Sequence, residues 1–329
     1  MNHYELKSMK KEHLEDAARL FADNYRTERG RMPILPPRYE NHNTVLPLLG
    51  KLIQKAPGVV ALKNGNLSGY LIGQLLPAWR GRRSTFVPFW AHAVTGKKRR
   101  MILQYMYAHL SSNWTANGCF THLISVLAND KEMLDTLFWF GFGMAVIDSI
   151  RDFSDLQSPL ADIEVRRASL DDLEIILLLS QEFRRYMAGP PIFMPLVEKS
   201  SKKYNEKWLS NPANALWLGL YKKEAVAYME IGSLNEDYVI TDEKTVWIQG
   251  AYTKEHLRGK GFGAALLKCA LDWAQAQGYE KCAVDFEGEN ILASAFWLRH
   301  FRPTCFSLVR QVDERIGWAH KDRADEHFW

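Results

Sequence analysis

The sequence has little that would carry it across or into a membrane. Its purely apolar runs, such as Ile175–Leu179, cover only a few residues, so no membrane-spanning helix is predicted. The first residues lack the charged and then apolar pattern of a secretory signal. Cysteine is scarce and never forms a Cys-x-x-Cys pair. We therefore expect a reduced, cytoplasmic protein without a bound metal ion.

A strong excess of either charge is lacking too. The 42 basic residues exceed the 38 acidic ones by only four, which does not favour nucleic acid as a partner. The hydrophobic share of 47% is typical of a globular protein, and 329 residues suffice for two domains.

An internal repeat indicates how the chain is divided. Residues 4–14 and 163–173 each read as a short strand, a polar turn and a helix start, and Ser169 with Asp172 forms a plausible capping box in the second copy. The same spacing pairs Pro36 with Pro195, Phe142 with Phe301 and Arg151 with Arg310. The alternative is coincidence between two unrelated α/β domains. We predict domains over 1–153 and 163–313, a linker over 154–162 and a tail over 314–329.

Each half shows the same order of strands and helices around a proline-rich loop. In the first half, strands are predicted near Val59–Leu62, Gly69–Leu76, Phe86–Ala93, Phe120–Leu127 and Met144–Arg151. In the second half, they are predicted near Ala215–Tyr221, Ala225–Ser233, Thr245–Tyr252, Lys281–Phe286 and Cys305–Val312.

The most informative segment is Arg258–Gly263, which follows a strand and opens an amphipathic helix. A helix N-terminus presents free backbone N–H groups and partial positive charge to an anion. Glycine at 259, 261 and 263 lets a diphosphate approach the backbone, and Arg258 and Lys260 add positive charge.

Arg258, Gly261 and Gly263 form an R-x-x-G-x-G pattern that resembles the coenzyme A loop of the GCN5-related N-acetyltransferase (GNAT) superfamily. The later Asn290, Ala293, Phe296 and Trp297 resemble its N-x-x-A-x-x-F-Y helix. The resemblance implies an α/β (α+β) fold class: two tandem GNAT-like domains, each a mixed, mostly antiparallel twisted sheet flanked by helices. The motif is missing from the first half, which we interpret as a degenerate copy.

The resemblance also implies the activity and the residues that perform it. The donor would be acetyl-CoA, and the acceptor the amine of a small molecule or peptide that attacks the thioester directly. The implied cofactor-binding residues are Thr253, Arg258, Gly259, Lys260, Gly261, Phe262, Gly263, Ala264, Asn290 and Trp297. Thr253 would contact the oxyanion through its main chain.

The sequence offers several candidates for the catalytic residues. Trp297 stands where the superfamily often has a tyrosine that protonates the thiolate, and an indole N–H does not serve as an acid. Candidate bases are Glu230, Tyr252 and Glu287, each of which also has a purely structural interpretation. Tyr186, Phe193 and Met194 are the expected acceptor-binding residues, with core packing as the alternative.

Other interpretations stay open. Gly259, Gly261 and Ala264 also match a dinucleotide-binding fingerprint, with Asp285 ending a later strand. The glycine-rich helix start could also bind nothing. The chain could be a non-catalytic acyl-CoA-binding or regulatory module, or use another acyl donor. Monomer and homodimer are both compatible with the sequence.

Two basic clusters in the first half are open to two interpretations. Lys97, Lys98, Arg99 and Arg100 crowd the start of a predicted helix, and Arg80, Arg82 and Arg83 lie in a predicted loop beside Trp79. They form either a solvated surface or a site for an anionic ligand.

Overall fold

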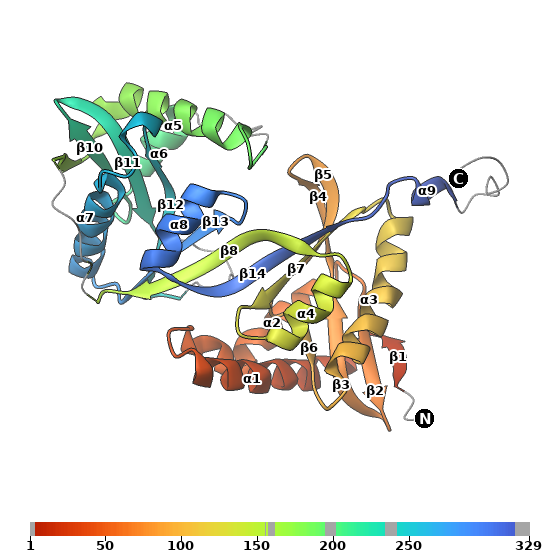
Figure 1. Cartoon of the computed structure of the whole chain (residues 1–329). Helices are drawn as coiled ribbons and strands as arrows, with labels where there is room; N and C mark the ends of the chain where they lie inside the picture. The colour runs from red at the N-terminus through yellow and green to blue at the C-terminus, as the bar shows by residue number, and fades with distance from the viewer. Residues whose placement is uncertain (1–3, 155, 157–161, 195–201, 234–241, 320–329) are drawn as a thin grey trace. The chain divides into compact units, whose positions relative to one another are not determined.

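The computed structural model describes residues 4–154, 156, 162–194, 202–233 and 242–319. Contacts group the chain into two units (Figure 1). Unit 1 comprises Met1–Val146 and Thr304–Trp329, and unit 2 comprises Ile147–Pro303. Pro195, most of the predicted linker and the last ten residues lie outside the described residues.

Unit 1 is built from two sheets and the helices that cover them. Its helices are α1 (Leu14–Arg31), α2 (His42–Leu52), α3 (Arg99–Ala116), α4 (Lys131–Trp139) and α9 (Ile316–Ala319). Its strands are β1 (Glu5–Ser8), β2 (Gly58–Lys63), β3 (Asn66–Ile72), β4 (Gln74–Trp79), β5 (Arg82–Val87), β6 (His92–Val94), β7 (Thr121–Leu127), the start of β8 (Gly143–Asp152) and β14 (Arg302–Gln311) from Thr304. The strand orders are β1-β2-β3-β6 and β4-β5-β7-β14.

Unit 2 is one sheet between helices. Its helices are α5 (Leu173–Ala188), α6 (Lys202–Leu209), α7 (Phe262–Ala276) and α8 (Ile291–His300). The strand order is β8 from Ile147, β13 (Lys281–Glu287), β12 (Thr245–Thr253), β11 (Glu224–Gly232), β10 (Ala215–Tyr221) and β9 (Glu164–Arg167). β9 to β12 pair antiparallel, and β12 pairs parallel with β13.

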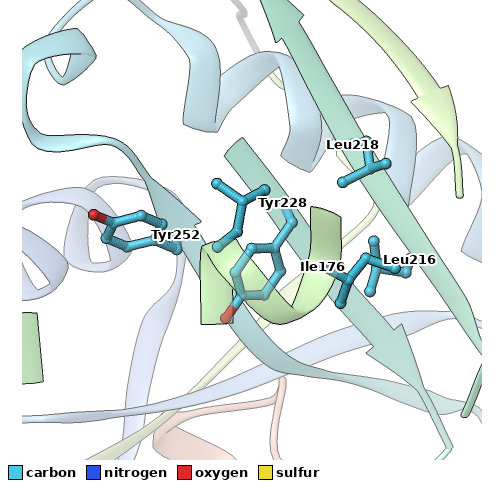
Figure 2. Packing of buried hydrophobic residues seen from close by; sticks show 6 residues of the cluster. Ile176, Leu216, Leu218, Tyr228 and Tyr252 are labelled. Atoms are coloured by element: carbon cyan, nitrogen blue, oxygen red, sulfur yellow. The ribbon is translucent and has the colours of Figure 1, made fainter. Parts of the chain in front are cut away.

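The two faces of the unit 2 sheet follow from side-chain alternation along its strands. Ile176 and Leu179 of α5 pack with Leu216, Leu218, Tyr228 and Tyr252 of the sheet in one buried cluster (Figure 2). Tyr221 points to the other face, where its ring lies 5.5 Å from that of Phe262 at the start of α7. α5 and α7 therefore cover opposite faces, and the end of β12 lies between them.

The predicted fold class and repeat are confirmed. Three pairs of elements recur at the predicted spacing: β1 with β9, the short turn before α1 with the one before α5, and β8 with β14. The Ser169 and Asp172 capping box also forms, at the short 3-10 helix before α5.

Two strand predictions in the first half are wrong. The expected strand Gly69–Leu76 is two strands, β3 and β4, that meet at Gly73, where a Cβ would lie 2.4 Å from the Trp114 ring. The expected strand Phe86–Ala93 is divided by Pro88, which has no N–H and whose carbonyl accepts from the Ala91 N–H at 2.8 Å.

The basic segment after Trp79 is a hairpin, not a long loop. Arg80 and Gly81 have φ of 48° and 78°, the left-handed values that a two-residue hairpin turn requires. Arg82 and Arg83 belong to β5, and the Arg80 guanidinium lies 4.5 Å from the Trp79 ring centroid.

The units also divide the chain differently from the predicted boundaries, which assign β8 to the first domain and β14 to the second. From Cys305 to Gln311, β14 pairs antiparallel with β7, residue for residue down to Thr121. β14 therefore completes the sheet of unit 1, although most of that unit comes from the first half of the chain.

Candidate functional site

Unit 2 contains a cavity of about 440 Å³ where β12 ends and α7 begins. α5, β12, the loop to α7, α7 itself and α8 all contribute to its walls. Of the predicted cofactor residues, all but Lys260 line it, and of the predicted acceptor residues, Tyr186 does.

The cavity exists because β12 separates from β13. Their parallel pairing ends at Ile248 and Val284, whereas β12 stays paired with β11 as far as Thr253. A bulge accompanies the separation, since Glu230 pairs with Gly250 and Ile231 with Ile248. The last residues of β12 thus have a partner strand on one side only.

The backbone of this free edge has a definite orientation. Lys254 N donates to Val226 O at 2.9 Å, which continues the hydrogen-bonded register in which Tyr252 faces Tyr228. Because N–H and C=O groups of successive residues alternate in direction, those of Ala251 and Thr253 point away from β11, toward the opened side. This edge offers backbone N–H donors to the cavity.

The glycine loop at the other end of the cavity has the features of an anion site. Gly259 and Gly261 have φ of 78° and 82°, and Gly261 is the N-cap of α7. The first hydrogen bond of the helix runs from Ala265 N to Gly261 O. The N–H groups of the helical residues that precede Ala265 therefore have no partner within the helix. A Cβ on Gly263 would lie 3.3 Å from the Phe296 ring, so glycine also allows α8 to approach closely.

Arg258 joins the loop to the strand and to α5. Its Nε donates to Thr253 O at 3.0 Å, and its guanidinium lies 4.1 Å from the Tyr186 ring centroid and 5.5 Å from that of Tyr252. Lys260 is exposed and points to Tyr221, 5.6 Å from its ring centroid, outside the cavity lining.

Asn290 is the N-cap of α8 and a second junction. Its Oδ1 accepts from Ala293 N at 3.1 Å and from the Tyr186 hydroxyl at 2.7 Å. Its Nδ2 lies 3.7 Å from the Met187 sulfur. The C-terminal turn of α5 is therefore bonded to the helix start that the sequence motif identified.

The candidate bases differ in their surroundings. Glu230 is 8% exposed, and its Oε2 lies 3.4 Å from where a Cβ on Gly250 would be, next to the cavity-lining Ala251. Burial raises the pKa of the Glu230 carboxyl to about 7. Burial and then the charge of Glu182 raise the pKa of Tyr252 to about 12, so it stays protonated. Glu287 ends β13, and neither it nor Glu230 is among the residues that line the cavity.

The remaining predicted residues are placed as follows. Trp297 lines the cavity and is 6% exposed, with its ring centroid 4.7 Å from that of Phe296. Phe193 is 68% exposed in the loop after α5, and neither it nor Met194 lines the cavity.

Of the residues on α5, sequence reasoning found Tyr186 but missed Glu182 and Phe183. Glu182 accepts from the Tyr252 hydroxyl at 3.4 Å, and Phe183 lines the cavity. A signal was present, because Leu179, Phe183 and Tyr186 recur at the spacing of one helix face.

The fold that the dinucleotide alternative requires is not present in the described residues of unit 2. A dinucleotide-binding fold needs a mostly parallel sheet with the glycine turn directly after a strand. Here β9 to β12 are antiparallel, and a short 3-10 helix, Glu255–Leu257, separates β12 from the glycines. Asp285 does not line the cavity.

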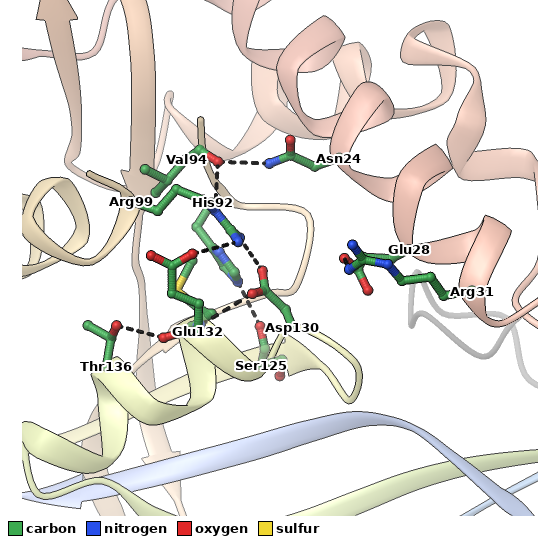
Figure 3. A network of polar contacts seen from close by, with 11 residues as sticks. Asn24, Glu28, Arg31, His92, Val94, Arg99, Ser125, Asp130, Glu132 and Thr136 are labelled. Carbon is green, nitrogen blue, oxygen red and sulfur yellow. Dashed lines mark hydrogen bonds and ion pairs between the residues drawn. The ribbon is translucent and has the colours of Figure 1, made fainter. Parts of the chain in front are cut away.

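In unit 1 the corresponding region contains a network of polar contacts between the protein's own side chains (Figure 3). Its loop from strand to helix is only Thr95–Lys98, against Lys254–Gly261 in unit 2. At the start of α3, Arg99 pairs with Asp130, the N-cap of α4, and with Glu132 at 3.2 Å.

His92 bridges the matching gap between strands. It lies on β6, is buried, and its Nε2 donates to Ser125 O of β7 at 2.8 Å. Arg100 pairs with Asp135 at 3.5 Å, so part of the basic cluster is engaged within unit 1.

Among the described residues, no group of three or more His, Cys, Asp or Glu side chains is arranged to hold a metal ion. Within the same ranges, no helix is long and apolar enough to span a membrane.

Comparison with known proteins gives a consistent result. Residues 179–301 match the model of the acetyltransferase (GNAT) family. No curated protein matches the sequence. A GCN5-related N-acetyltransferase from Sphaerobacter thermophilus is similar with a TM-score of 0.59 and 13% identity, over 94% of this chain and 95% of that one.

Two further solved structures cover 94% of this chain. A tandem GNAT protein from the clavulanic acid biosynthesis pathway has a TM-score of 0.50 and 12% identity over 98% of its own length. A GCN5-related glucosamine N-acetyltransferase region of a fungal multi-domain β-N-acetylglucosaminidase has a TM-score of 0.55 and 13% identity, and the match spans only 38% of that chain. At such identities the likeness concerns the fold alone.

Proposed function

We propose that this chain, whose second unit carries a domain of the GNAT acetyltransferase family, transfers an acetyl group from acetyl-CoA to the amine of a small molecule or peptide. One observation carries the proposal. The free edge of β12 and the glycine-rich start of α7 meet in a single cavity of unit 2. The free strand edge would bind the thioester arm, and the helix start would bind the diphosphate of the same donor.

The residues fit the donor at both ends. The unpaired N–H groups at the start of α7 would hold the diphosphate, with Arg258 adding positive charge. The free edge of β12 would hydrogen-bond the arm that carries the thioester. The N–H of Thr253 or Ala251 points toward the opened side and would stabilise the oxyanion.

Glu230 is the base that the geometry supports best. The amine nitrogen attacks the carbonyl carbon, the C–N bond forms, and the amine proton passes to the Glu230 carboxylate. The C–S bond then breaks and the thiolate leaves. A carboxyl whose pKa is about 7 is well matched to proton transfer near neutral pH. Tyr252, with a pKa of about 12, stays protonated and cannot accept the proton. Neither glutamate lines the cavity, but the Glu230 carboxyl lies against Gly250, next to the cavity-lining Ala251.

A non-catalytic acyl-CoA-binding module is the second candidate, and a donor other than acetyl-CoA is the third. Turnover separates the first two, because only an enzyme releases free coenzyme A in the presence of an amine. Longer acyl thioesters tested beside acetyl-CoA address the donor.

Calorimetric titration tests the cofactor site directly. Wild type is titrated with acetyl-CoA and with NAD, beside Gly261→Glu, which places a carboxylate at the proposed diphosphate site. The matched control is Gly278→Glu, since Gly278 has the same left-handed backbone (φ 86°) beyond the end of α7. We expect acetyl-CoA binding in wild type and control and its loss in Gly261→Glu. Binding of NAD instead, or equal loss in both variants, would contradict the assignment.

A further inference from the structure

We propose that Tyr186 is the proton donor to the departing coenzyme A thiolate, in place of a residue at position 297. This inference rests on the acetyl transfer proposed above. It concerns the second half of the reaction, after the amine has added to the thioester.

The reaction leaves a basic sulfur. A free thiol has a pKa of about 8.5, so the thiolate released at neutral pH takes up a proton, and a placed donor assists C–S cleavage. Trp297 lines the cavity but has only an indole N–H, which does not ionise in this range. A proton donor from the protein would therefore be another cavity-lining group.

Few of the lining side chains can do so. Hydroxyl groups in the lining belong to Tyr186, Tyr252 and Thr253, and an aliphatic hydroxyl is too weak an acid. The Tyr252 hydroxyl faces the Glu182 carboxylate at 3.4 Å, which opposes loss of its proton. The pKa of His300 is lowered by burial, so its imidazole is neutral at pH 7 and has no acidic proton to give.

Two contacts hold Tyr186 in the cavity wall. Its hydroxyl donates to Asn290 Oδ1 at 2.7 Å, and its ring lies against the Arg258 guanidinium at 4.1 Å. Burial raises the pKa of Tyr186, while the charge of Arg258 acts in the opposite direction. A tyrosinate formed at this position would therefore face a cation.

The step balances without another reagent. The C–S bond breaks, its electron pair goes to sulfur, and sulfur takes the proton from Tyr186 Oη. The tyrosinate regains a proton from water, and the amine's proton stays on Glu230 until it exchanges with solvent. When Tyr186 turns its O–H to sulfur, Asn290 Oδ1 still accepts from Ala293 N–H, so the cap of α8 is kept.

The test separates proton donation from anchoring of Asn290. Tyr186→Phe keeps the ring over Arg258 and removes only the hydroxyl. We expect kcat to fall about 100-fold, at the lower end for acid–base groups, with the Kd for acetyl-CoA within about threefold of wild type. Tyr105→Phe, at an exposed position of unit 1, is the control and should keep wild-type values.

The double variant Tyr186→Phe/Trp297→Tyr provides the rescue. A hydroxyl restored to the cavity from α8 should recover at least tenfold in kcat, which an anchoring role would not allow. An unchanged kcat in Tyr186→Phe, a Kd that weakens in step with kcat, or a folded double variant that stays slow would each overturn the proposal. If wild type binds acetyl-CoA but releases no coenzyme A with any amine, the proposed function fails first, and the inference fails with it.

Discussion

Replacing Glu230 by glutamine should make the protein more stable and less active. The Glu230 carboxyl is 8% exposed, beside Leu216 on β10 and Gly250 on β12. Burial raises its pKa from 4.5 to about 7. At 1.36 kcal/mol per pKa unit, keeping this group charged costs the folded state about 3 kcal/mol above pH 7.

The sign of the pH dependence follows from linkage. Because the folded pKa lies above the unfolded one, stability from this group is full below about pH 4.5 and is lost as pH rises through 7. Glutamine has no proton to lose. Urea unfolding at pH 8 should therefore show Glu230→Gln to be more stable by up to about 3 kcal/mol, and the gain should shrink toward pH 5.

Exposed Glu243 supplies the control, since Glu243→Gln should change stability little at either pH. A Glu230→Gln variant that is less stable at pH 8, or equally stabilised at both pH values, would refute the reasoning about burial. In activity, the same variant should lose about 10²- to 10⁴-fold in kcat, and the decline of wild-type rate below pH 7 should disappear. A folded variant with full activity would exclude Glu230 as the base.

Three further outcomes are expected. Gly263→Val should weaken acetyl-CoA binding about tenfold or more by calorimetry and lower stability by about 1–3 kcal/mol, because even a Cβ would lie 3.3 Å from Phe296. Asp172→Ala should lower the free energy of unfolding by about 1–3 kcal/mol at pH 7, because Arg166 donates two bonds to this buried carboxylate, at 2.6 and 2.8 Å. The hydrogen bonds from Arg166 lower the pKa of Asp172. The stability difference between wild type and Asp172→Ala should therefore vanish in urea titrations carried out at pH values below that folded-state pKa. Calorimetry should give one acetyl-CoA per chain, and His92→Ala in unit 1 should leave that site's affinity unchanged; two sites would contradict the degenerate copy.

Local chemistry made much of the site predictable. Gly259 and Gly261 adopt left-handed backbone, which the glycine-rich pattern anticipates, and Asn290 caps its helix at the position the motif gives. The capping box at Ser169 needs only residues three apart. In each case the signal and the structure lie within a few residues of each other.

What the sequence did not reveal depends on contacts between distant segments. The environment of Glu230 arises from neighbours on β10 and β12, and nothing in the local sequence AYMEIG indicates burial of a carboxylate. Tyr186 meets Asn290 across more than a hundred residues. Pattern reasoning finds elements and loops, but not which side chains two elements bring together.

The comparison of the two units shows what a binding site of this kind requires. Both units separate two strands beside a helix start, yet unit 1 spans its gap with His92 and neutralises Arg99 with Asp130. Its loop Thr95–Lys98 is shorter than the loop of unit 2 that we propose to wrap an anion. The proposed cofactor site therefore rests on more than strand separation. A free strand edge, a long glycine loop and unpaired helix N–H groups coincide only in unit 2 among the described residues. β14 completes the sheet of unit 1 through its pairing with β7. A cut at the linker would therefore leave β7 with an open edge in unit 1.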